Sequence, residues 1–186
     1  KQIMEIMHAI KKRRTIHSFS ETSVPKEIIE RSIDAANQAP CHRMTFPWRF
    51  TSIGRNKREL LLELQLKIKF GDKQIGQRNI ERTRAKFLNP SHLLIASQVS
   101  TNNQVQARED YAACACAIQN LSLSLVANGV GSKWSTGEIT TDMRTYEIAE
   151  IIPSDEEIIG FIWVGYGDIP TPINRPSISS IFREKD

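Results

Sequence analysis

Two adjacent arginines and a threonine, Arg13, Arg14 and Thr15, offer the clearest anion-binding chemistry in the chain. Arginine binds phosphate oxygens through two parallel N–H donors, and such charge-assisted hydrogen bonds are about twice as strong as neutral ones. The hydroxyl of Thr15 adds a further donor beside them. Because the triplet follows a predicted amphipathic helix, the alternative is a helix end whose solvated arginines complement the helix dipole. The residues alone favour the helix end over a phosphate site.

A second candidate is the irregular segment from Pro40 to Trp48, whose two prolines fix the course of the chain. His42 and Arg43 within it could meet the polar edge of a ligand, and so could His17 nearer the N-terminus. A single histidine is more often a structural hydrogen-bonding group than a ligand contact. These residues therefore indicate a binding loop only in combination with other observations.

A third candidate is the loop predicted from Gly129 to Gly137, in which three glycines surround Trp134. Glycine lets the backbone approach a ligand closely, and an indole ring can lie beside a flat ligand. The alternative is a tight connection from a helix to a strand, because glycine after Asn128 is a usual end of a helix. Composition alone favours neither interpretation.

Several other chemistries lack their motifs in this sequence. The glycines after Asn128 do not complete a dinucleotide fingerprint, and there is no P-loop, H-E-x-x-H or G-x-S-x-G motif. Cys114 and Cys116 are two positions apart on a predicted helix, so they point about 200° away from each other and are poorly placed to share a metal ion. With only Cys41 besides, the cysteines favour reduced thiols in a cytoplasm-like compartment. The residues thus suggest an anionic, partly planar ligand without naming it.

Composition indicates a single globular domain. The chain has 186 residues, of which 40% are hydrophobic and 25% charged, and a net charge of +4. It has no long apolar run and no secretory signal pattern, so we expect no membrane partner and a cytoplasmic location. Positive charge concentrates between Arg55 and Lys86, with glutamates interleaved. We expect a solvated helix face there and no nucleic-acid partner, because no nucleic-acid-binding motif accompanies the charge.

The elements that would position these residues are mostly helical. Apolar spacing and caps predict helices at 2–12, 25–38, 56–70, 75–86, 107–128 and 141–151, and strands at 49–53, 92–99 and 157–166. Because helices and strands do not alternate strictly, the pattern indicates the α+β class. We expect one domain over 1–186, with 71–90 as a mobile cover and 168–186 as an extended tail. The small set of helices would leave the long helix at 107–128 partly uncovered, which predicts a twofold dimer.

Four stretches, taken in order, resemble the landmarks of the FMN-dependent nitroreductase family, and especially its small single-domain members. They are RRTIHSF near the N-terminus, APCHRMTFPWRF after the second helix, NGVGSKWSTG after the long helix, and EEIIGFIWVGYG before a tail with Pro and Arg. Each motif is loose by itself, but four at matching separations span nearly the whole chain.

The resemblance implies a nitroreductase-like α+β fold with a central, mostly antiparallel sheet flanked by helices, and a homodimer that binds FMN at its interface. It also implies reduction by NAD(P)H and transfer to an electron-poor acceptor such as a nitroaromatic or a quinone, with no protein nucleophile because the flavin carries the chemistry. The residues it implies at the cofactor are Arg13, Arg14, Thr15 and Arg175 around the phosphate and ribityl end, His42 and Phe46 along the ring from across the interface, and Trp134, Thr136 and Gly137 beside the ring or its phosphate side.

The sequence departs from the family pattern at several of these positions. Phe46 stands where such loops usually carry Gln, and Met44-Thr45 lacks a nearby Asn. His17-Ser18 occupies a position where a further Arg is common, and Ile173 one where some members are basic. These departures imply a changed acceptor or weaker FMN retention. The alternative functions are a flavin-binding member without efficient turnover and, less favoured, a basic interaction module.

Overall fold

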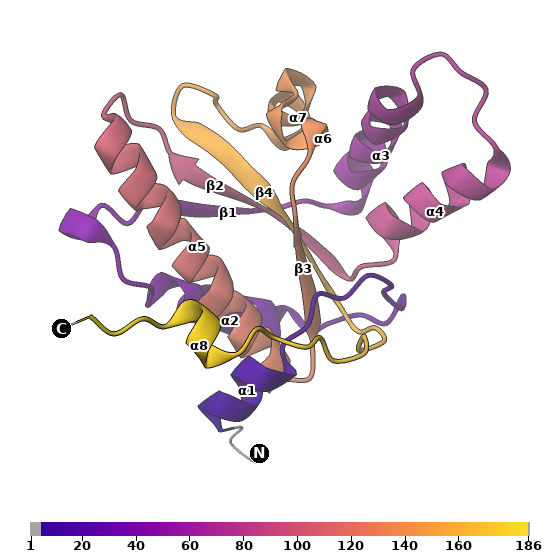
Figure 1. Ribbon diagram of the computed structural model, residues 1–186. Coiled ribbons are helices and arrows are strands. Elements are labelled where there is room, and N and C mark those ends of the chain that lie inside the picture. The colour runs from indigo at the N-terminus through magenta and orange to yellow at the C-terminus, as the bar shows by residue number, and fades with distance from the viewer. Residues whose placement is uncertain (1–4, 186) are drawn as a thin grey trace.

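The computed structural model describes residues 5–185, and its centre is a four-stranded antiparallel sheet in the order β1-β2-β4-β3 (Figure 1). The strands are β1 (Trp48–Ser52), β2 (His92–Val99), β3 (Gly131–Ser135) and β4 (Glu156–Gly165). The central strands β2 and β4 are buried along most of their length, as their continuous apolar runs predict for strands covered on both faces. The predicted α+β class with an antiparallel central sheet is confirmed.

One face of the sheet packs against two helices, α2 (Lys26–Asn37) and α5 (Gln104–Ala127). The side chain of Asn103 begins α5 by accepting hydrogen bonds from the backbone N–H groups of Val105 and Gln106. The helix ends where Gly129 adopts a φ of 75° and the Val130 N–H returns to the Leu125 carbonyl at 3.0 Å. This is the helix end that the Asn-Gly pair predicts.

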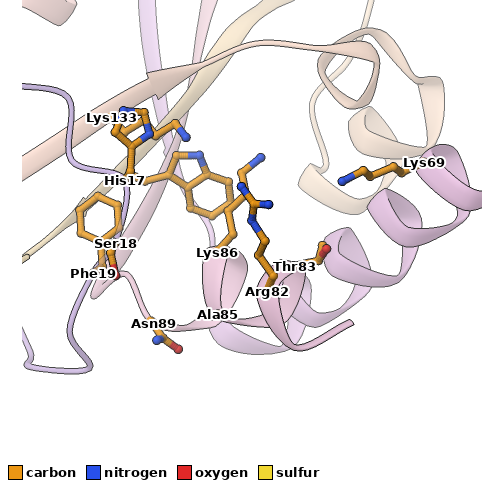
Figure 2. Close-up of a pocket in the computed structure, with 11 residues that line it drawn as sticks. His17, Ser18, Phe19, Lys69, Arg82, Thr83, Ala85, Lys86, Asn89 and Lys133 are labelled. Atoms are coloured by element: carbon orange, nitrogen blue, oxygen red, sulfur yellow. The ribbon is translucent and has the colours of Figure 1, made fainter. Parts of the chain in front are cut away.

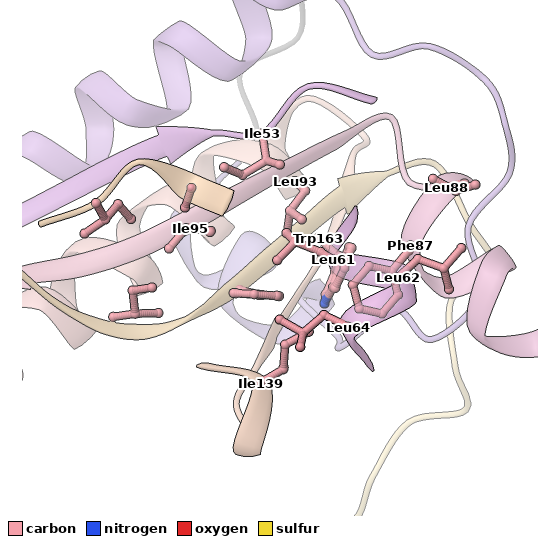
Figure 3. Packing of buried hydrophobic residues seen from close by; sticks show 14 of the residues in the cluster. Ile53, Leu61, Leu62, Leu64, Phe87, Leu88, Leu93, Ile95, Ile139 and Trp163 are labelled. Carbon is pink, nitrogen blue, oxygen red and sulfur yellow. The ribbon is translucent and has the colours of Figure 1, made fainter. Parts of the chain in front are cut away.

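The other face packs against α3 (Arg55–Phe70), α4 (Gln77–Leu88), α6 (Glu138–Thr141) and α7 (Met143–Ala149). Its core contains Phe87 and Trp163, whose rings meet edge to face with centroids 5.0 Å apart (Figure 3). Arg58 is buried below this face and donates to the Pro90 carbonyl at 2.6 Å. These contacts fix the C-terminal end of α4, while the mobility of 71–90 stays a prediction.

Three short helical elements complete the chain: α1 (Ile6–Lys12), η1 (His42–Met44) and α8 (Ile178–Ile181). The predicted helix at 2–12 begins in residues that lie outside the described part. The helix predicted at 141–151 is present as α7, which is shorter at both ends and begins where the Asp142 side chain accepts from the Arg144 N–H. The turn of helix before it, α6, was not predicted. Strand β3 was not predicted: its segment was interpreted as part of a loop.

A bulge in β4 determines where the Trp134 ring lies. The pairing of β2 with β4 shifts register between Ala96 and Ser97, and Gly160 adopts a φ of 157°. A Cβ at Gly160 would overlap the Trp134 indole, whose Nε1 donates to the Ile159 carbonyl at 3.2 Å. The bulge therefore makes room for the indole on the α2 and α5 side of the sheet.

Candidate functional site

Three arginines from the two ends of the chain form a cationic cluster: Arg13, Arg14 and Arg175. Arg13 is half-buried, and its pKa is lowered by burial and then by the charges of Arg175 and Arg14. Arg14 Nη1 donates to the carbonyls of Lys11 and Arg13, at 2.5 and 2.8 Å. Within residues 5–185 no carboxylate pairs with any of the three. Such a cluster is suited to a polyanionic group such as phosphate.

The chain then runs along the outer edge of β3. Thr15 forms a parallel bridge with Ser132, and the Ile16 N–H donates to the Ser132 carbonyl at 3.1 Å. A Cβ at Gly131 would overlap the Ile16 side chain, so this glycine permits close chain packing instead of ligand approach. In the described chain, Ser132 is the only β3 residue bridged on that side. The backbone edge beyond it can therefore hydrogen-bond a ligand.

A pocket of about 530 Å³ lies beside the same segment, between residues 17–19, β3, α3 and α4 (Figure 2). This volume is typical of small-molecule sites. Trp163 lies at the base of the pocket and is almost fully buried, and none of the lining residues is acidic. The lining cations are Lys69, Arg82, Lys86 and Lys133. The pocket can therefore stabilise negative charge on a bound ligand.

Lys86 is the most constrained of these cations. It is half-buried, with its Nζ 5.6 Å from the Phe87 ring centroid and 5.7 Å from that of Trp163. Burial lowers the pKa of Lys86, and the charges of Lys133 and Lys69 lower it further. No carboxylate within 4 Å offsets this charge in residues 5–185. A bound anion would remove this electrostatic cost.

The other residues suggested in this region are Trp134, which lies on β3, and Thr136 and Gly137, which follow it. Trp134 points to the face opposite its strand neighbour Lys133, because successive strand residues alternate, so the indole does not line the pocket. Thr136 and Gly137 follow the strand and are exposed, and a side chain at Gly137 would meet open space. Thr136 lies four strand residues, or about 13 Å, beyond Ser132. Their contact with a cofactor stays a prediction.

His42 and Phe46 lie elsewhere in the chain. Figure 1 shows η1 at one side of the molecule and α4 at the other. His42 Nε2 is 3.9 Å from Glu109 Oε1 on α5, and the Phe46 ring is 51% exposed, with its centroid 6.0 Å from that of Trp48. Within one chain the structure therefore does not bring these two residues to the pocket.

The loop that carries them has an unusual backbone. Arg43, Met44 and Phe46 have φ values of 53°, 53° and 44°, in the left-handed region that non-glycine residues rarely adopt. Thr45 donates to the buried carboxylate of Asp110 at 2.6 Å, which fixes the loop to α5. Strained backbone of this kind is concentrated at binding sites.

Sequence reasoning missed the four pocket cations, three of which lie in the segment expected to be a solvated helix face. A local signal was available. Arg78, Arg82 and Lys86 follow each other at intervals of four residues, so they share one helix face. Like charges at this spacing destabilise a helix by about 0.2–0.5 kcal/mol per pair, and a bound anion would relieve that repulsion.

The model of the nitroreductase family matches residues 10–166 of this sequence. The chain belongs to the nitroreductase family. This confirms the resemblance of the four motifs, and membership supports an oxidoreductase.

Named relatives agree with this assignment. The sequence is 29% identical over 181 residues to the "Putative NAD(P)H nitroreductase YfhC" of Bacillus subtilis (strain 168), covering 94% of this chain and 91% of the relative.

Solved structures share the nitroreductase fold. A nitroreductase-like family protein from Bacillus cereus superposes with a TM-score of 0.83 at 24% identity, covering 100% of this chain and 98% of the other. The FMN and NADPH-dependent nitroreductase NfnB of a "sphigopyxis" strain superposes with a TM-score of 0.82 at 12% identity, covering 98% and 100%. In residues 5–185 no helix is long and apolar enough to cross a membrane.

Proposed function

We propose that this protein is an FMN-dependent NAD(P)H oxidoreductase that transfers a hydride through bound flavin to an electron-poor acceptor such as a nitroaromatic or a quinone. The observation that carries the proposal is the placement of two cationic sites along one short segment. The arginine cluster begins at Arg13 and the pocket begins at His17. Four residues of extended chain span at most about 13 Å, so one ligand of the size of FMN can reach both sites.

The residues present fit FMN in charge. Arg13, Arg14 and Arg175 would hold its phosphate, with Thr15 at the ribityl chain. Lys86 and Lys133 would lie at the ring, where their charge stabilises the anionic reduced form. The cofactor and nicotinamide dependence named for NfnB supports this assignment.

FMN, when bound, accepts a hydride from NAD(P)H and passes it on. The chain's own contribution is to orient the reactants and to provide positive charge. In a nitroaromatic acceptor, the nitro group takes up one hydride and one proton and releases water to leave the nitroso compound. The half-buried Lys86 lowers the energy of the negative charge that arises before that proton arrives.

We further propose a homodimer in which a second copy contributes His42 and Phe46 to the site. Large apolar side chains are exposed near both chain ends, a pattern that indicates an uncovered interface. They are Ile6, Ile10, Ile178, Ile181 and Phe182. Sedimentation that finds a stable monomer with bound FMN would contradict the shared site.

An absorbance spectrum tests the function directly. The purified protein, with FMN added if it is colourless, should show flavin bands that bleach when NADH or NADPH is added without oxygen. Reoxidation by a nitroaromatic or a quinone should restore them. A protein that fails to bind added FMN would overturn the proposal.

A second candidate function is flavin binding without efficient turnover. It is favoured by Phe46, an exposed ring where the family pattern usually carries Gln. In this case the flavin would bind but bleach slowly, and Phe46→Gln should raise the rate of reduction. No change in that rate would exclude Phe46 as the cause of slow turnover.

A further inference from the structure

The pocket described above is lined by four cations. Its four cations divide by exposure into an inner and an outer pair. Lys86 and Lys133 are half-buried, whereas Lys69 and Arg82 are exposed. Figure 2 shows Lys69 reaching from α3 and Arg82 from α4 toward the space around Lys86. The outer pair therefore lies at the mouth of the pocket, where a substrate enters.

Among residues 5–185 this outer pair has no acidic partner within 4 Å. None of the pocket-lining residues is acidic, and no carboxylate in the described chain pairs with Lys69 or Arg82. Arg82 also lies four residues before Lys86 on one helix, where two cations repel each other. The charge of Lys69 in turn acts on Lys86 and lowers its pKa. An anion bound among these charges would relieve the repulsion that acts on Lys86.

We propose that Lys69 and Arg82 make the pocket select substrates that carry a carboxylate, sulfonate or phosphate group. This rests on the proposed function, in which the flavin ring lies in this pocket and both the reductant and the acceptor must approach it. The anionic group is either a substituent of the acceptor or the additional phosphate that distinguishes NADPH from NADH. In both cases Arg82 offers a planar pair of donors and Lys69 a second positive charge.

The test compares anionic with neutral substrates of similar shape. For the FMN-loaded enzyme, kcat/KM is measured for 4-nitrobenzoate and 4-nitrobenzamide as acceptors, and for NADPH and NADH as reductants. The variant Lys69→Gln/Arg82→Gln removes the outer pair. Its matched control, Lys67→Gln/Arg84→Gln, removes the same charge from the same two helices at exposed positions that do not line this pocket.

We expect at least one anionic-to-neutral ratio to fall on the order of tenfold in Lys69→Gln/Arg82→Gln, and neither to fall in the control. The ratio that falls identifies the substrate carrying the anion. If both ratios stay within about twofold of wild type, the selection is overturned, while turnover of neutral substrates would leave the proposed function intact.

A binding measurement on the protein without flavin tests the anion site separately from the proposed oxidoreductase function. The protein as purified is titrated by calorimetry with 4-nitrobenzoate and with 2′,5′-ADP, which carries the phosphate specific to NADPH. Binding of either probe that is weakened in Lys69→Gln/Arg82→Gln but not in the control supports the anion site, whether or not FMN binds. Absent or unchanged binding of both probes overturns it.

Discussion

Replacing Arg13 by Gln should have opposite effects on folding and on FMN binding. Its guanidinium is half-buried beside Arg14 and Arg175, and its side chain has no hydrogen-bond partner in residues 5–185. Removing the charge relieves both the burial cost and the repulsion. The free energy of unfolding of the apoprotein should therefore stay the same or rise.

The same change should weaken FMN binding. A hydrogen bond to a charged group contributes about 1.5–3 kcal/mol, which corresponds to roughly 10- to 150-fold in Kd. Riboflavin lacks the phosphate, so its affinity should not change. The Kd ratio of riboflavin to FMN should fall by that factor in Arg13→Gln, and added salt should lower this ratio in the wild type.

Quenching of flavin fluorescence on titration with apoprotein measures both affinities, and urea unfolding measures stability. Lys11→Gln, which removes a charge from an exposed position at the end of α1, is the matched control. The reasoning is refuted if Arg13→Gln leaves the Kd ratio of riboflavin to FMN unchanged. It also fails if the variant loses stability, since Arg13 would then be a structural helix end.

Three further outcomes test the structure. Gly160→Ala should lower the free energy of unfolding, measured by urea titration, by about 2–4 kcal/mol, because the new Cβ overlaps Trp134 and the backbone φ is unfavourable for alanine. Gly54→Ala, where a Cβ would meet open space, should change the free energy of unfolding little in the same titration. The pKa of Lys86 is lowered in the folded state, so the unfolded state binds more protons at pH values between the folded-state pKa and 10.5. The free energy of unfolding should therefore rise with pH in that range, and urea titrations of Lys86→Met should show a smaller rise. Burial raises the pKa of the Cys114 thiol to about 12, so at pH 8 it should react with a thiol reagent only after unfolding, and Cys114→Ser should remove that slow phase.

The parts of the fold that were predictable are those specified by local patterns. The apolar run from Ile158 to Val164 and the Asn-Gly helix end needed only a few neighbouring residues to interpret. Strand β3 is five residues, GSKWS, with two serines and a lysine, so its strand conformation depends on pairing with β4. Its partner is distant in sequence, and single-sequence reasoning could not supply it.

Arg13, Arg14 and Thr15 were found because they are adjacent in the sequence, whereas the pocket was not found. Its cations come from α3, α4 and β3, and meet only when the chain folds. The face on which the Trp134 ring lies was equally inaccessible, because a bulge in another strand determines it. The sequence could therefore indicate the kind of ligand but not the cavity that receives it.

The open edge of β3 has a consequence for producing the protein. Unpaired N–H and C=O groups beyond Ser132 form a template on which another chain can add a strand. A cofactor lying along that edge would cover it as an additional strand would. When the protein is synthesised faster than flavin is supplied, it should therefore self-associate. Supplementing the culture with riboflavin should increase the fraction of the protein that is recovered without self-association.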